Sequence, residues 1–74
     1  MHTLKLPLAF IRDCIECECD VGQWDGKRIT ATPEQLAEIK GRARYYAEDG
    51  LDAAPPGLIR SAKATLATLE RLGL

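Results

Sequence analysis

Three cysteines lie close together among acidic residues near the N-terminus, and thiolates are ligands that can hold a metal ion. Cys14, Cys17 and Cys19 stand in the run DCIECECD, which also holds four carboxylates. With a fourth donor such as His2, they could form the tetrahedral shell that zinc prefers. No second pair of ligands follows downstream, however, and acidic neighbours raise the pKa of a thiol, so that thiolates form less readily. We expect no metal here, and a metal site at these cysteines is kept as an alternative.

We interpret the cysteines as reduced thiols that fill the core like small apolar residues. An odd number of cysteines cannot all pair within one chain, and small secreted domains usually carry an even set. A redox role for Cys14 and Cys17 would need the thioredoxin context of a helix that follows a strand, which the sequence lacks. On a helix, Cys19 is expected to point away from the other two.

The inventory of catalytic side chains is small. The chain has one histidine, His2, in a terminus expected to fray, and one serine, Ser61, within a predicted helix. A serine-histidine-acid triad therefore cannot be assembled. A calcium loop around Asp25-Gly26 also fails, because an EF-hand register would place Val21 at the first ligand position and Thr32 at the last. We expect a protein that is not an enzyme and that needs no cofactor.

Length and composition predict one small globular domain over residues 1–74. The chain is 46% apolar and 28% charged, with a net charge of −1, which argues against a disordered tail or a coiled-coil rod. A pI near 5.7 weakens the electrostatic argument for nucleic-acid binding. The apolar stretch 4–11 is broken by Lys5 and Pro7 and is too short to span a bilayer. We expect a soluble, cytoplasmic protein.

The periodicity of apolar residues predicts the secondary structure. A helix is expected at about 7–16, a strand after it to about 21, and a β-hairpin turn at Asp25-Gly26 with a return strand at 27–31. A bulge at Gly22 would bring the apolar residues of the hairpin onto one face. Two more helices are expected at 33–48, ended by Gly50, and at 56–72, ended by Gly73. The predicted fold class is α+β and mostly helical: helix, β-hairpin, helix, helix.

Helix and strand periods compete over residues 15–31, and the boundary between the first helix and the strand is left open within 15–21. The residues predicted to form the core are Phe10, Ile11, Ile15, Ile29, Leu36, Ile39, Tyr46, Ile59, Leu66 and Leu69.

The middle helix carries a second face that could bind a partner. Ala37, Gly41 and Tyr45 recur four apart opposite its core stripe, and Arg42 flanks them. A glycine within a helix costs about 1 kcal/mol relative to alanine, so close approach by another backbone would account for it. The favoured account is that the first helix packs there; the alternatives are a partner protein or a second copy of the chain. Trp24, beside the hairpin tip, either covers the core or anchors an interface.

Charge is distributed unevenly along the chain. Residues 1–25 sum to −3, residues 26–44 to +3 and the remainder to −1. Such a layout can steer an encounter with a charged partner, although a solvated surface accounts for it as well. Five basic residues of the last two helices could contact phosphates: Lys40, Arg42, Arg44, Arg60 and Lys63. The connector 50–57 is too long and too rich in proline for a helix-turn-helix, so nucleic-acid binding is kept only as an alternative.

Several short motifs follow one another along the chain: Leu6-Pro7 followed by Phe10-Ile11 and Asp13, then ARYY at 43–46, and then SAKAT at 61–65. In this order they resemble a group of short phage and prophage proteins without assigned function. The cysteine-rich stretch departs from that pattern. The resemblance implies a cytoplasmic accessory protein of a mobile element and carries over no catalytic residue. We therefore expect a non-catalytic protein-binding module that modulates or inhibits a host system.

Overall fold

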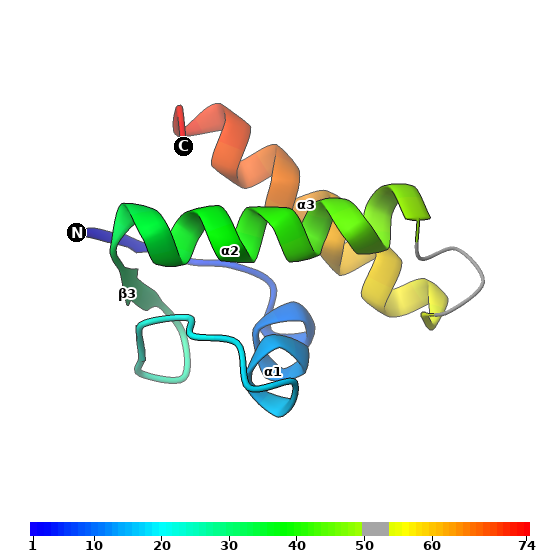
Figure 1. Cartoon of the computed structure of the whole chain (residues 1–74), viewed down its shortest axis with the longest axis horizontal. Coiled ribbons are helices and arrows are strands. Elements are labelled where there is room, and N and C mark those ends of the chain that lie inside the picture. The colour runs from blue at the N-terminus through cyan, green and yellow to red at the C-terminus, as the bar shows by residue number, and fades with distance from the viewer. Residues whose placement is uncertain (50–53) are drawn as a thin grey trace.

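The computed structural model describes residues 1–49 and 54–74 and shows three helices beside a small sheet (Figure 1). The elements are β1 (His2–Leu4), α1 (Leu8–Glu16), β2 (Gln23–Trp24), β3 (Ile29–Ala31), α2 (Pro33–Arg44), a π-helical turn η1 (Tyr45–Asp49) and α3 (Pro56–Arg71). Helices make up more than half of the chain, which confirms the prediction of a mostly helical α+β fold.

The sheet is antiparallel in the order β1-β3-β2, and β1 was not predicted. His2, expected in a fraying terminus, instead pairs with Ala31 of β3. The hydroxyls of Thr3 and Thr30 share a hydrogen bond of 3.0 Å across the same pair of strands. The strand has three residues with a single buried side chain, Leu4, so its sequence shows too little alternation to signal a strand.

The hairpin forms as predicted, but its turn lies one residue further along the chain. Trp24 pairs with Ile29, which places Gly26 and Lys27 at the tip. The carboxylate of Asp25 accepts hydrogen bonds from the backbone N–H groups of Lys27 and Arg28, both at 2.8 Å. Gly26 has a φ of 97°, the left-handed region that glycine enters without strain. The carboxylate of Asp25 therefore holds the turn and does not sit at its tip.

The predicted strand at 17–21 is wrong, because the chain reverses direction at the end of α1. Glu18 N–H donates to Ile15 O at 3.0 Å, and Cys19 N–H donates to Cys14 O at 2.9 Å. These two bonds are those of a Schellman motif, with Glu18 in the left-handed region at a φ of 61°. The residues that form this reversal are the ones whose alternation of apolar and acidic side chains predicts a strand.

The predicted bulge at Gly22 is wrong, because no strand forms at 17–21 and Gly22 lies in the loop before β2. Its φ is +80°, and a Cβ at this position would collide with the backbone oxygen of Thr30. The carboxylate of Asp20 accepts from Gly22 N–H at 3.0 Å and from the side-chain amide of Gln35 at 2.8 Å. The loop before β2 is thus joined to the start of α2.

The ends of α2 and α3 follow from local sequence signals. The capping box at the start of α2 is confirmed: Gln35 N–H donates to Thr32 Oγ1 at 3.2 Å, and Thr32 N–H donates to Gln35 Oε1 at 2.8 Å. The Gly73 stop is also confirmed, with bonds from Gly73 N–H to Glu70 O at 3.1 Å and from Leu74 N–H to Leu69 O at 2.8 Å. The α-helix α2 ends at Arg44, earlier than predicted, because the chain widens into η1. The predicted stop at Gly50 lies outside the described residues.

One hydrophobic core lies between the helices and the sheet. Most of the predicted core residues are buried: Phe10, Ile11, Ile29, Leu36, Ile39, Ile59 and Leu69. Tyr46 and Leu66 are half-buried at its edge. Ile15 is 41% exposed, so its placement in the core was wrong. Among the described residues, no helix has the length and apolar character needed to cross a membrane.

Candidate functional site

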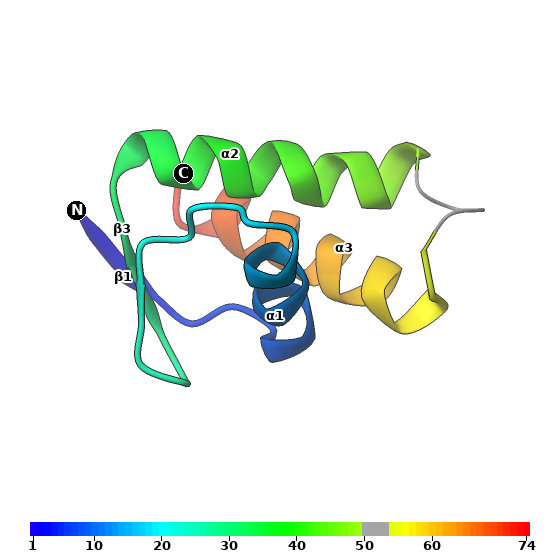
Figure 2. The same ribbon diagram turned by 60° about the horizontal axis from the view of Figure 1, so that its bottom comes forward.

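One side of α2 is left open by the rest of the fold. Figure 2 shows the other elements gathered on one side of this helix. Ala37 and Gly41 of α2 and Tyr45, the first residue of η1, are exposed on the opposite side, and we call these three residues the α2 face. Tyr45 has 52% of its surface exposed, an unusual amount for a large side chain with apolar character.

Internal packing does not require a glycine at position 41. A Cβ built at Gly41 would meet no heavy atom within 4 Å beyond the helix itself. The expectation that the first helix packs against this glycine is therefore wrong. A glycine within a helix still costs about 1 kcal/mol relative to alanine. Gly41 leaves the surface of α2 uncovered at this position, and no contact within the described residues depends on it.

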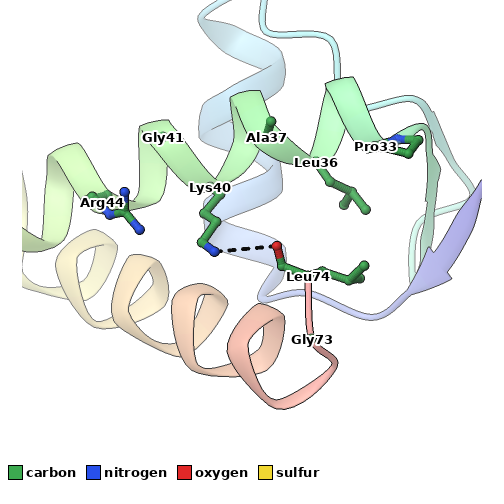
Figure 3. Close-up of a pocket in the computed structure, with 8 residues that line it drawn as sticks. All are labelled: Pro33, Leu36, Ala37, Lys40, Gly41, Arg44, Gly73 and Leu74. Carbon is green, nitrogen blue, oxygen red and sulfur yellow. Dashed lines mark hydrogen bonds between the residues drawn. The ribbon is translucent and has the colours of Figure 1, made fainter.

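A groove runs beside the α2 face, between α2 and the C-terminal end of α3 (Figure 3). It encloses about 440 Å³. Its apolar lining includes the buried Leu36 and the half-buried Leu74, and Ala37 and Gly41 form part of its border. Leu74 reaches this position because the Schellman motif at Gly73 turns the chain back toward α2.

Two cations line the groove. Lys40 and Arg44 are four residues apart and therefore lie on the same side of α2. Lys40 Nζ donates to the backbone oxygen of Leu74 at 3.4 Å. Within residues 1–49 and 54–74, neither cation pairs with an aspartate or glutamate side chain, and no such side chain lines the groove. Like charges at this spacing slightly destabilise a helix, so the pair creates a positive site without helping the fold.

Arg42, predicted to flank the binding face, is engaged inside the chain. Its guanidinium pairs with the carboxylate of Asp13 on α1 at 3.2 Å and donates to Tyr46 Oη at 2.7 Å. The same group stacks over the Tyr46 ring at 5.1 Å from the centroid. Phe10 meets the ring of Tyr46 edge-on at 6.5 Å. Arg42 thus fastens α1 to α2, on the flank away from Lys40 and Arg44.

Trp24, the other predicted interface residue, lies on β2 rather than near the α2 face. It pairs with Ile29 and is half-buried against the core. The structure therefore separates the predicted binding residues into an exposed group on α2 and two residues, Trp24 and Arg42, that pack within the fold.

The cysteines occupy three different environments. Cys14 is buried, Cys19 is half-buried against the core and Cys17 is exposed at the end of α1. The pKa of the Cys14 thiol is raised to about 12, mainly by burial and to a smaller extent by the neighbouring Cys19 and Asp13. Cys19, expected to point away, is brought back beside Cys14 by the backbone bond between them. The described residues gather no group of three or more potential metal ligands.

The groove could not be found from the sequence, although part of its chemistry is visible there. Lys40 and Arg44 stand four apart in a basic segment, and that spacing is a readable signal for a positive helix flank. The contact between Lys40 and Leu74 joins residues 34 positions apart in the chain. Only the packing of α3 against α2 brings them together.

Comparison of the chain with protein-family models, with curated proteins and with solved structures finds no match in any of the three.

Proposed function

We propose that this chain is a non-catalytic module that binds a protein partner through the α2 face and the adjoining groove. The observation that carries the proposal is Gly41, a residue unfavourable in a helix that no internal contact explains. Because Gly41 has no side chain, a partner could approach the backbone of α2 closely at this position.

The chemistry of the groove supports a partner segment of a particular kind. The apolar side chains of Leu36 and Leu74 favour an aliphatic side chain, while Lys40 and Arg44 favour neighbouring carboxylates. The exposed ring of Tyr45 offers a rigid contact at the edge of the same surface. These features support an acidic protein segment with an apolar anchor.

We also propose that such binding modulates or inhibits a host system, as in an accessory protein of a mobile element. This part of the proposal is supported by the resemblance in residue order alone. In this part of the proposal the partner is a host protein, and the surface that binds it is still the α2 face with the adjoining groove.

Affinity purification from the native host followed by mass spectrometry tests the proposal. Three versions of the chain are compared: wild type, Gly41→Leu, and Ala64→Leu, which places the same side chain at an exposed position of α3. We expect wild type and Ala64→Leu to retain the same partner and Gly41→Leu to lose it.

Thermal melting of the same three proteins separates binding from folding. Because open space surrounds Gly41, the leucine variant should melt at an unchanged or slightly higher temperature. A partner that Gly41→Leu retains as well as wild type does would show that the α2 face is not the binding surface.

A further inference from the structure

We propose that the groove beside the α2 face takes the C-terminal end of α1 from a second copy of this chain. In this arrangement, Ile15 of one copy lies against Leu36 and Leu74 of the next, with Glu16 and Glu18 toward Lys40 and Arg44. The inference rests on the proposed function, because it uses the same protein-binding surface, for which a second copy and a host protein would compete.

The end of α1 carries the features that the groove selects. Ile15 is 41% exposed, one of the few large apolar side chains that the fold leaves in solvent. Glu16 and Glu18 are exposed beside it, one on the last helical residue and one in the reversal that follows. An aliphatic anchor flanked by two carboxylates complements a groove that holds two leucines and is flanked by two cations.

The charge of the whole chain favours the same pairing. The segment that contains Ile15, residues 1–25, sums to −3, and the segment that contains most of the groove, residues 26–44, sums to +3. Opposite charge on two regions of one surface draws the acidic end of one copy toward the basic side of another. Arg12 is exposed one turn before Ile15 and opposes this attraction in part.

The end of α1 cannot reach the groove of its own chain. Asp13 on α1 is held by Arg42, which lies on the other flank of α2 from Lys40 and Arg44. The views in Figures 1 and 2 agree that α1 and the C-terminal end of α3 lie at separate places around α2. The complementary surfaces can therefore meet only between two molecules.

A contact of this kind is heterologous, since different surfaces of the two copies meet. Unless two such contacts form reciprocally about a two-fold axis, it generates rings or open chains. The groove is small, so the association should be weak and visible only in concentrated protein at low ionic strength. Screening should reduce it about tenfold or more as the salt concentration rises to about 0.5 M.

Sedimentation velocity of the purified chain tests the proposal, with a reductant present because Cys17 is exposed. Two variants each remove one surface: Gly41→Leu/Arg44→Glu blocks the groove, and Ile15→Ser/Glu16→Lys alters the end of α1. All four positions are exposed, so both variants should fold, and circular dichroism and melting check this. Arg60→Glu, with the same change in charge as Arg44→Glu on an exposed site of α3, serves as the control.

Mixing the two variants gives the decisive result. Each variant alone should be monomeric, whereas the mixture should form a discrete one-to-one dimer, because one retains the groove and the other retains the end of α1. Wild type and Arg60→Glu should both form larger species that salt dissociates.

A wild-type chain that stays monomeric up to about 1 mM at low salt would overturn the inference, as would a mixture that does not pair. The proposed function is judged separately by partner capture. A monomeric chain whose captured partner depends on Gly41 would place a segment of another protein in the groove and refute self-association.

Discussion

Cys14 shows how burial alters the chemistry of a single side chain. Its pKa of about 12 keeps the thiol protonated at neutral pH, whereas Cys17 is open to solvent. We expect iodoacetamide to label Cys17 first and Cys14 only as the protein unfolds, with mass spectrometry of peptides as the measurement. In denaturant all three cysteines should react. Equal labelling of Cys14 and Cys17 in the native protein would contradict the buried position of Cys14.

Glu18 is a residue in a conformation that its type does not favour. It holds the left-handed position of the Schellman motif, where glycine is usual and where other residues pay about 1–2 kcal/mol. Glu18→Gly should therefore raise the free energy of unfolding by up to about 1 kcal/mol, as measured by thermal melting, since part of the gain is lost to the entropy of glycine. Gly73→Ala, at the equivalent position after α3, should shift stability the opposite way. Destabilisation by Glu18→Gly would mean that the glutamate side chain itself supports the reversal.

At the scale of whole elements, the contact between α1 and α2 depends on one arginine. Arg42 bonds to Asp13 on one helix and to Tyr46 on the turn that extends the other. Arg42→Ala should lower the free energy of unfolding by about 1–3 kcal/mol, because the partners lose a charged hydrogen-bond donor. Arg44→Ala, which removes an exposed arginine two residues further along α2, should change it by less than about 0.5 kcal/mol.

A double-mutant cycle with Asp13→Asn isolates the ion pair itself. About a fifth of each side chain is exposed, 22% for Arg42 and 21% for Asp13, so the coupling should be modest, on the order of 0.5–1.5 kcal/mol. Strictly additive effects of the two substitutions would show that the pair contributes nothing beyond the separate contacts of each residue.

The start of α2 is coupled to the loop before β2 through the carboxylate of Asp20. Hydrogen bonds from the Gln35 side chain and from Gly22 N–H hold the pKa of Asp20 below its ordinary value of 3.8. A lowered pKa in the folded state stabilises the fold above pH 3.8, and this stabilisation is lost as the pH falls through and below that value. Asp20→Asn should therefore flatten the acid limb of a stability curve measured by urea unfolding. An unchanged acid limb would mean that Asp20 carries no folding-linked proton.

At the scale of the whole molecule, Gly22 decides whether the sheet and α2 can come together. Gly22 and Gly26 both have positive φ, but only at Gly22 would a Cβ collide with backbone, that of Thr30. Gly26→Ala should cost about 1 kcal/mol, the strain of the left-handed conformation alone. Gly22→Ala should cost at least about 2 kcal/mol more in the same melting experiment. Equal losses for the two variants would show that the chain around Gly22 relaxes without cost.

The sequence by itself determined the features whose causes lie within a few residues. The capping box of Thr32 and Gln35 and the glycine stop at Gly73 were readable because each pairs groups at most five positions apart. The burial of Leu36 and Ile39 on α2 and of Ile59 and Leu69 on α3 was readable for the same reason, since a helical period repeats within one turn. The sequence also indicated the second face of α2, although it predicted that the first helix would pack against that face.

Tertiary structure decided the rest, because the deciding contacts join residues far apart in the chain. The pairing of His2 with Ala31 turned an expected loose end into a strand, and the reversal at Glu18 left Ile15 in solvent instead of in the core. The groove exists only because Leu74 returns to Lys40. A periodic pattern records which side of an element is apolar, but it does not record which other element covers that side. That choice depends on how all the elements fill one core together, and it left Ile15 and Gly41 uncovered.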